Sequence, residues 1–231
     1  MGIQILRGRN EANKRANITI VIDVIRAFTV AHYAFMKGAR RIYLVETVEE
    51  AFQLKKNNPS LLLAGEVDGY PIEGFEFDNS PFRMKDHNVS GETIVQRTTN
   101  GVRATLNCLN SDHLFVTGFS NARSTAEFIQ TNYMVEDLDI NIVASHPSGD
   151  DDYACAEYIQ HIIDENTEKV TEDEVKRRII ESDAARKFFN ENNIAFIKED
   201  ILHCAKELTT DFVMKVNSAS TIPMIERVQV C

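Results

Sequence analysis

The sequence predicts an α/β fold in which a mostly parallel sheet is flanked by helices. Two observations lead to this prediction. Short runs of β-branched and other apolar residues alternate with helical patterns over the first two thirds of the chain, which is typical of strand–helix–strand units. Most of these runs are apolar throughout, as expected for strands that are covered on both faces. The length of 231 residues is that of one large α/β domain spanning 1–231.

Six segments of the first two thirds are expected to be strands, and helices are expected between them. The strands begin at Asn17, Arg41, Leu61, Glu92, His113 and Asn141. The helices cover 27–39, 47–58, 100–109 and 121–133. Thr47, with Glu50 three positions later, has the spacing of a capping box, which predicts where the second helix starts. The segment 67–91, rich in Gly, Pro, Asp and Asn, is expected to be a long loop of the kind that often carries function.

The pattern changes after Ser145, where charged helical segments follow one another with few strands between them. These segments cover 149–166, 172–190 and 199–210. We expect a helical insertion or subdomain over 150–210. The remaining segments, 212–220 and 221–230, are expected to close the fold as a strand or hairpin.

The composition disfavours several classes of partner. There are 25 Lys and Arg against 35 Asp and Glu, so the net charge is −10, whereas nucleic acid and anionic membranes require a basic surface. No apolar run reaches the roughly 18 residues that span a bilayer, and the first residues lack the apolar stretch of a signal peptide. We therefore expect a cytoplasmic protein without nucleic-acid or membrane partners, whose assembly into a homo-oligomer is left open. The four cysteines are scattered and are expected to be buried free thiols.

Polar residues follow the predicted strands at the edge where ligands bind to open parallel sheets. Asp23 and Arg26 follow the first strand, and Glu66 ends the third. Later strand ends deliver three further groups, namely Arg97 with Thr98, Thr99, Asn100 and Gly101, then Gly118 to Asn121, and finally Ser145 to Asp152. Of the six histidines, only His146 is singled out as a candidate by its position at a strand end.

Each candidate has a structural alternative. The turn from Arg97 to Gly101 opens a helix, so its backbone N–H groups either bind an anion such as phosphate or are simply capped by Thr and Asn. Asp23 either acts in chemistry or caps the helix that follows it. Ile25 occupies the position where a haloacid-dehalogenase-type phosphatase needs a second Asp, which excludes that phosphoenzyme mechanism. Glu66 in a sheet interior must be paired, hydrogen-bonded or bound to a metal.

Several segments, in the same order, resemble the 2-phosphosulfolactate phosphatase family, which is associated with coenzyme M biosynthesis. They are VIDVIRAFT from Val21, LAGEVDGYPIEGFEFDNSP from Leu63, TIVQRTTNGVRA from Thr93, TGFSNA from Thr117 and, more loosely, ASHPSGDDDYACAEYI from Ala144. The resemblance implies an α/β fold and the magnesium-dependent hydrolysis of a small anionic phosphate monoester, 2-phosphosulfolactate or a related phospho-hydroxy acid. The substrate would carry a sulfonate and a carboxylate.

The resemblance also implies roles for individual residues. Asp23 and Arg26 fall on the family's Asp-x-x-Arg, and Glu66 on its Gly-Glu. The implied catalytic residues are Asp23, Arg26, Glu66 and Arg97. The implied substrate-binding residues are Asn79, Ser80, Thr98, Thr99, Asn100, Gly101 and Asn121. The implied ligands of Mg²⁺ are Asp23, Glu66 and one or both of Asp151 and Asp152, which otherwise belong to a solvated helix N-terminus.

The sequence departs from the family pattern in three places. His146, Pro147 and Ser148 replace its Gly-rich turn after the sixth predicted strand. The other two departures keep other functions open. Val67 stands where the pattern has Arg, and Asp78 where it has Gly. They motivate the alternative of a non-catalytic protein that binds small anions on the same fold. An interaction module formed by the charged helices of 157–210 is a third alternative, although such helices are usually just solvated.

Overall fold

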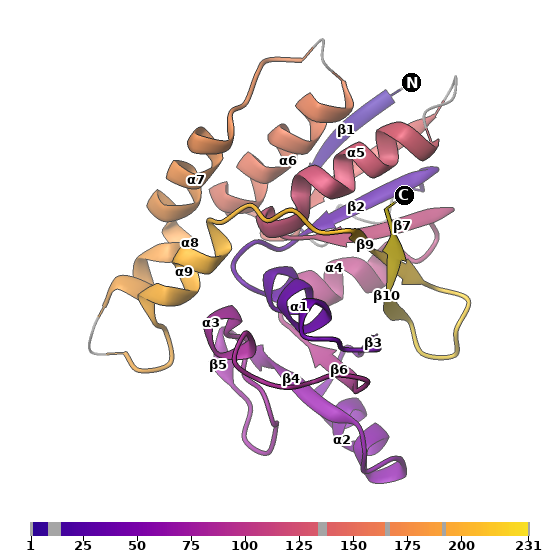
Figure 1. The fold of residues 1–231 in the computed structure, drawn as a ribbon, viewed down its shortest axis with the longest axis vertical. Coiled ribbons are helices and arrows are strands. Elements are labelled where there is room, and N and C mark those ends of the chain that lie inside the picture. The colour runs from indigo at the N-terminus through magenta and orange to yellow at the C-terminus, as the bar shows by residue number, and fades with distance from the viewer. Residues whose placement is uncertain (1, 9–14, 134–137, 165–166, 191–192, 231) are drawn as a thin grey trace.

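The structure is a computed structural model that describes residues 2–8, 15–133, 138–164, 167–190 and 193–230 (Figure 1). Within these residues it forms a mixed, mostly parallel ten-stranded sheet flanked by helices, which confirms the predicted fold class. The strands are β1 (Gly2–Arg7), β2 (Ile18–Ile22), β3 (Arg41–Leu44), β4 (Leu62–Val67), β5 (Tyr70–Pro71), β6 (Thr93–Arg97), β7 (His113–Thr117), β8 (Asp139–Ala144), β9 (Phe212–Asn217) and β10 (Met224–Gln229).

The helices lie between these strands and largely where the sequence predicts them. They are α1 (Ala27–Met36), α2 (Val48–Asn57), α3 (Pro81–Met84), α4 (Gly101–Asn107), α5 (Ala122–Tyr133), α6 (Asp150–Ile163), α7 (Glu172–Glu181), α8 (Asp183–Arg186) and α9 (Lys198–Cys204), with 3₁₀ turns η2 (Phe119–Asn121) and η3 (Lys187–Phe189). The predicted capping box opens α2, because Thr47 Oγ1 accepts the Glu50 N–H and Glu50 Oε2 accepts the Thr47 N–H.

The sheet consists of two parallel halves that are joined by a hairpin. Its strand order is β1-β8-β2-β7-β9-β10-β3-β6-β4-β5. The strands β1, β8, β2 and β7 pair in parallel, as do β3, β6 and β4. The expected closing hairpin, β9 and β10, is antiparallel to both halves, so the halves run in opposite directions along the sheet.

In a flat sheet this arrangement would place the carboxyl ends of the two halves at opposite edges. The joins to the hairpin are narrow, however: β7 and β9 share the single register pair Phe115–Lys215, and β10 and β3 share two pairs. The sheet can therefore turn at the hairpin, and Figure 1 shows the two halves converging away from it. The carboxyl ends of β2 and β6 meet there, because the Gly101 N–H donates to Asp23 Oδ2 at 2.8 Å.

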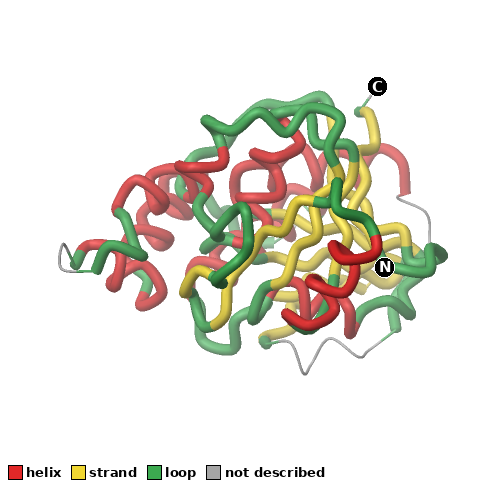
Figure 2. Tube along the Cα trace, turned by 90° about the horizontal axis from the view of Figure 1, so that it is seen from below, coloured by secondary structure: helices red, strands yellow, loops and turns green. Residues whose placement is uncertain are grey.

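Helices fill and cover the two halves. Helix α1 lies between them (Figure 1), and its residues pack in one apolar core with Val116 of β7, Ile94 of β6 and Val102 of α4. A second core lies on the outer face of β2, β7 and β8, against α5 and α6, and a third joins α2 to the outer face of β3 and β6. In Figure 2 the strands accordingly run through the middle of the molecule with helices on both sides.

Three elements were not expected from the sequence. β1 pairs in parallel with β8 at the edge of the sheet, and its burial alternates along GIQILR, which is a weak strand signal. β5 and α3 lie within the segment that was expected to be a loop. The last predicted helix ends at Cys204 rather than at residue 210, because the Leu208 N–H donates to Ser120 O and the chain leaves the helix.

The remaining expectations have mixed outcomes. Cys155 and Cys204 are buried free thiols, Cys108 is buried, and Cys231 lies outside the described residues. No helix in the described part of the chain is long and apolar enough to cross a membrane. The expected helical segment toward the C-terminus is present as α6 to α9, and α6 packs against α5 and β8. The division of the chain into domains stays a prediction.

Candidate active site

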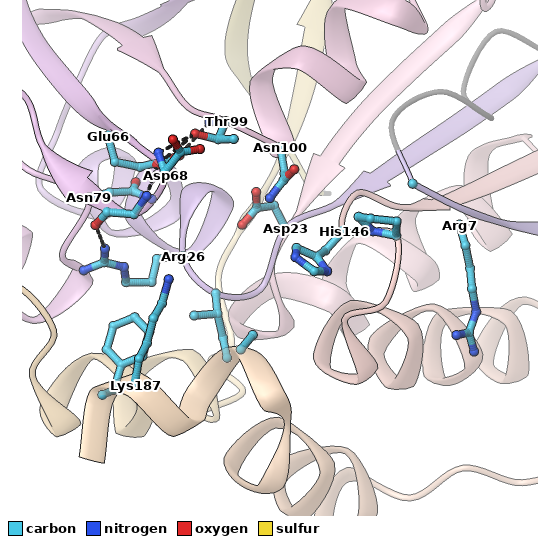
Figure 3. A pocket seen from close by; sticks show the side chains of 16 residues that line it. Arg7, Asp23, Arg26, Glu66, Asp68, Asn79, Thr99, Asn100, His146 and Lys187 are labelled. Carbon is cyan, nitrogen blue, oxygen red and sulfur yellow. Dashed lines mark hydrogen bonds between the residues drawn. The ribbon is translucent and has the colours of Figure 1, made fainter. Parts of the chain in front are cut away.

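A cavity of about 650 Å³ opens where the two halves of the sheet converge (Figure 3). Its wall is built from the ends of several strands and from the C-terminal helices. The lining residues include Asp23 after β2, Glu66 of β4, Thr99 and Asn100 after β6, His146 after β8, and Lys187 and Phe188 of η3. The cavity therefore gathers polar residues that lie far apart in the sequence.

Asp23 holds the starts of two helices together at the cavity wall. Its Oδ1 accepts the Ala27 N–H of α1 at 2.9 Å, and its Oδ2 accepts the Gly101 N–H of α4 at 2.8 Å. A Cβ at Gly101 would lie 2.6 Å from Asp23 Oδ2, so only glycine allows this approach. Burial raises the pKa of Asp23 to about 6; the Ala27 N–H opposes this shift, and the charge of Glu66 adds to it.

Glu66 is held by the backbone of two neighbouring loops. Its Oε1 accepts the Thr99 N–H at 2.5 Å, and its Oε2 accepts the Gly69 N–H at 2.5 Å and the Thr99 hydroxyl at 3.0 Å. Gly65 precedes it with φ +147°, and a Cβ there would lie 1.9 Å from Arg97 O, which explains the glycine. The orientation of the Glu66 carboxylate beside the cavity is thus fixed by three hydrogen bonds.

Arg26 lines the cavity but is committed to protein partners. Its Nη1 donates to Asp200 Oδ2 at 2.8 Å and its Nη2 donates to Gly69 O at 2.9 Å. Its guanidinium lies 4.9 Å from the ring centroid of Phe188. Asp200 is fully buried and also accepts the Ser80 hydroxyl at 2.5 Å. Arg26 therefore ties the cavity wall to α9 as well as contributing positive charge.

Three further basic or titratable groups face or border the cavity. Desolvation lowers the pKa of Lys187, and the charge of Arg26 lowers it further, whereas Glu66 and Asp68 raise it. Desolvation also lowers the pKa of His146, and the charge of Lys187 adds to this shift. Arg7 lies at the other end of the cavity, with its guanidinium 3.6 Å from the ring centroid of Tyr153 (Figure 3).

Asp151 and Asp152 lie behind the cavity wall rather than in its lining. Both carboxylate oxygens of Asp152 accept hydrogen bonds from the protein. Its Oδ1 accepts the Val24 N–H, and its Oδ2 accepts the Ser145 hydroxyl and the His146 N–H. Asp151 Oδ1 is buried without a hydrogen-bond partner. Burial raises the pKa of Asp151 to about 7, and the charge of Asp23 adds to the shift. Burial and the charges of Asp151 and Asp23 raise that of Asp152.

This concentration of carboxylates fits a cation. Asp23, Asp151 and Asp152 are buried close enough to oppose one another's ionisation, and one oxygen has no donor. Among the described residues, no set of three or more His, Cys, Asp and Glu side chains is arranged as a metal cage. Magnesium is usually held by one or two carboxylates together with waters and substrate phosphates, so it does not need such a cage.

The structure brings six of the predicted site residues into the cavity and leaves seven outside its lining. Those inside are Asp23, Arg26, Glu66, Asn79, Thr99 and Asn100. Those outside are Ser80, Arg97, Thr98, Gly101, Asn121, Asp151 and Asp152. Arg97 donates to Glu66 O at 2.7 Å, so it supports the strand end from behind. Asn121 is buried in its own turn, where its Oδ1 accepts the Thr117 hydroxyl and the Gly118 N–H.

The turn from Arg97 to Gly101 also differs from the anion cradle that was considered. Its N–H groups at Thr99 and Gly101 bind the carboxylates of Glu66 and Asp23, and Thr98 Oγ1 accepts the Val102 N–H. Of the expected caps, Thr98 is present, whereas Asn100 forms no side-chain cap. Asp23 also binds the start of α1. Both carboxylates nevertheless remain in the cavity lining.

Sequence reasoning missed Arg7, Asp200 and Lys187. The strand-end rule would have found Arg7 if the alternation of GIQILR had been taken as a strand. Lys187 and Asp200 carry no local signal, because both lie in charged helical segments whose side chains are usually solvated. Only the packing of η3 and α9 onto the sheet brings them to the site.

Comparison with known proteins places this site in a family. The sequence model of 2-phosphosulpholactate phosphatase matches residues 5–219. The chain belongs to the 2-phosphosulfolactate phosphatase family. It is 54% identical over 228 residues to the "Probable 2-phosphosulfolactate phosphatase" of Bacillus subtilis, covering 99% of each chain. It is also 31% identical over 217 residues to the protein of the same name in Clostridium perfringens, covering 87% of this chain and 86% of the relative.

Two of the three departures from the family pattern lie away from the lining of the cavity, whereas the third lies in it, since His146 and Pro147 line the cavity. Val67 is 38% exposed, and Asp78 forms an ion pair with Arg83. Neither residue lines the cavity. In this member of the 2-phosphosulfolactate phosphatase family, positive charge at the cavity comes instead from Arg7, Arg26 and Lys187.

Proposed function

We propose that this protein hydrolyses the phosphate monoester of 2-phosphosulfolactate, giving sulfolactate and inorganic phosphate. The structural observation that carries the proposal is the cavity in which Asp23 and Glu66 lie beside Arg26 and Lys187. Membership of a family whose relatives are named as phosphatases supports a small phosphorylated substrate and a phosphoric monoester hydrolase. It supports the enzyme over the alternative of a non-catalytic anion-binding protein.

We further propose that a magnesium ion assists this hydrolysis. Asp23 and Glu66 would hold it at the cavity wall, with Asp151 behind Asp23 as a buried carboxylate whose Oδ1 lacks a hydrogen-bond partner. When bound, the ion would withdraw charge from the phosphoryl oxygens and orient the attacking water. The carboxylates are pre-oriented for this role, because backbone N–H groups fix Asp23 and Glu66 in single positions.

The other lining residues would bind and orient the substrate. Arg26 contributes charge that favours an anion, while its bonds to Asp200 and Gly69 prevent it from moving away. The Asn79 and Asn100 amides also line the cavity and can hydrogen-bond anionic oxygens. Water adds to phosphorus, the ester oxygen leaves with a proton as the hydroxyl of sulfolactate, and the net reaction consumes one water.

Phosphate release from 2-phosphosulfolactate, with and without magnesium, tests this proposal. The variants Glu66→Gln and Asp23→Asn should lose most of the magnesium-dependent rate, whereas Glu73→Gln, an exposed carboxylate outside the cavity lining, should behave like the wild type. Near-normal turnover by both site variants would overturn the assignment of these carboxylates. Tight binding of phospho-hydroxy acids by the wild type without any turnover would restore the non-catalytic alternative.

The cellular setting also stays a proposal. A cytoplasmic location is supported by the buried free thiols of Cys155 and Cys204, because unpaired cysteines are typical of reducing compartments. The absence of a nucleic-acid partner remains a prediction, and assembly into a homo-oligomer remains open. Size-exclusion chromatography with light scattering would measure the latter.

A further inference from the structure

We propose that Lys187 binds the sulfonate of the substrate and thereby selects 2-phosphosulfolactate over phosphate monoesters that lack this group. The inference rests on the proposed function and adds to it a specificity residue. Lys187 lies in η3, outside every segment on which the family resemblance depends. It would also give the C-terminal helical block a direct role at the site.

The ammonium of Lys187 is the cavity cation that is poised for a ligand. Within the described part of the chain, Nζ has no hydrogen bond and no carboxylate oxygen within 4.0 Å. It lies 4.4 Å from the ring centroid of Phe196, and a Cβ at Gly69 would lie 2.9 Å from it. Figure 3 shows the side chain extending from its turn toward Arg26, into the cavity. The ammonium thus lies against the Phe196 ring and the Gly69 backbone, and its N–H donors have no hydrogen-bond acceptor among the described residues.

The other two cations of the cavity are differently placed. Arg26 already donates to protein acceptors, to Asp200 in an ion pair of 2.8 Å between buried side chains and to Gly69 O at 2.9 Å. Arg7 turns toward α6, where it stacks on Tyr153 (Figure 3). Besides desolvation, the charge of Arg26 lowers the pKa of Lys187, and the opposite charges of Glu66 and Asp68 each raise it by less. An anion beside Lys187 would relieve this unbalanced charge.

The chemistry of the substrate fits this position. The phosphate ester and the carboxylate share one carbon, and the sulfonate lies one carbon farther away. If the phosphoryl group lies at Asp23 and Glu66, the sulfonate is the group that extends along the wall toward η3. A lysine ammonium offers three rotatable donors to a group with three equivalent oxygens, whereas the planar fork of arginine is better matched to a carboxylate.

Three substrates separate the anionic groups in a kinetic test. 2-Phosphosulfolactate carries both groups, 2-phospholactate lacks the sulfonate, and 2-(phosphooxy)ethanesulfonate lacks the carboxylate. For Lys187→Met we expect kcat/KM to fall about 10- to 100-fold on the two sulfonates, mainly through KM, as for loss of a charged hydrogen bond. Turnover of 2-phospholactate should stay near the wild-type rate. Lys187→Arg should recover part of the loss, and sulfolactate should inhibit Lys187→Met more weakly than the wild type.

Arg186→Met provides the matched control. Arg186 is the neighbouring cation of the same segment, but it is exposed and pairs with Asp183 at 2.9 Å outside the cavity lining. We expect its kinetics to match the wild type on all three substrates. Thermal unfolding of each variant confirms that the fold is retained, and Lys187→Gln serves as a second neutral replacement.

Several results would overturn the inference. For Lys187→Met they are an equal fall in kcat/KM on all three substrates, a fall on the substrates that carry the carboxylate rather than on those that carry the sulfonate, or no fall at all. The same fall in kcat/KM in Arg186→Met would also overturn it. Each of these leaves wild-type turnover of 2-phosphosulfolactate intact and so leaves the proposed function standing. A wild-type protein that does not hydrolyse 2-phosphosulfolactate would overturn the proposed function and this inference together.

Discussion

Arg26 and Asp200 form a buried ion pair, with Nη1 and Oδ2 2.8 Å apart, although 174 positions separate them in the sequence. The pair joins the residue before α1 to α9 and is extended by the Ser80 hydroxyl, which donates to Asp200 Oδ1. It fixes the C-terminal helices, and with them Lys187 and Phe188, against the cavity wall.

We predict that Asp200→Asn destabilises the protein by about 3–5 kcal/mol, because it leaves a buried guanidinium without its counter-charge. Urea unfolding measures the loss, and phosphate release should fall with it. Asp183→Asn is the control, since its ion pair with Arg186 is largely exposed and such pairs contribute about 0–1 kcal/mol. Equal stability of the two variants would contradict the role of the buried pair.

Local sequence patterns predict several residues of the site but not how its two parts come together. The positions of Asp23, Glu66, Thr99 and Asn100 follow from the rule that ligands bind at the carboxyl ends of parallel strands. The rule assumes a single edge, however, and here two edges become one only because the sheet turns at the β9–β10 hairpin. No sequence pattern near Asp23 or Glu66 predicts that the sheet changes direction at the hairpin.

Side-chain roles were harder to predict than positions, because a residue type does not specify its partners. Arg97 has the right chemistry for phosphate, yet it donates to the carbonyls of Glu66 and Glu46. Lys187 and Asp200 belong to helices whose charges look solvated in sequence, and only long-range packing brings them to the cavity. Strand and helix propensities are local, whereas these contacts are not.

We predict that Gly101→Ala abolishes most of the activity by displacing Asp23. The added Cβ would lie 2.6 Å from Asp23 Oδ2 and 2.8 Å from its Cβ, so the carboxylate must move. A misplacement of about 1 Å at a catalytic group costs on the order of 100-fold in rate. Gly91→Ala is the control, because it adds a methyl group at φ +78° where nothing lies within 4 Å. Gly91→Ala should lower stability without changing kcat. A loss of kcat in Gly91→Ala comparable to that in Gly101→Ala would refute the prediction.

Arg97→Gln should lower kcat while changing KM little. Arg97 reaches the site through Glu66 O at 2.7 Å and the Thr99 hydroxyl at 3.4 Å and does not line the cavity, so its loss should loosen the end of β4 rather than remove a substrate contact. Steady-state phosphate release measures kcat and KM separately, with Arg103→Gln as the control. Arg103 forms an exposed ion pair with Glu46 and should be dispensable. A rise in KM without a change in kcat would instead place Arg97 on the substrate.

His32 should make stability depend on pH below neutrality. It is fully buried in α1, with Nδ1 2.9 Å from Ser120 Oγ and Nε2 3.3 Å from Thr210 Oγ1. Burial lowers its pKa from 6.5 to about 3, because the surroundings offer no compensation for a positive charge. Between these values the unfolded chain binds a proton that the folded protein does not.

The contribution of His32 to the free energy of unfolding should therefore be fully present above pH 6.5. It should decrease as the pH falls, by at most about 1.4 kcal/mol per pH unit. Urea unfolding of the wild type and of His32→Gln at pH 7.5, 6.5 and 5.5 measures the effect. Gln stays neutral over this range, so the variant starts from a lower stability through imperfect packing but should lose less of it on acidification. If the two proteins lost stability in parallel, other groups would have to account for the acid sensitivity, and the pKa of His32 in the folded protein would have to lie close to its value in the unfolded chain.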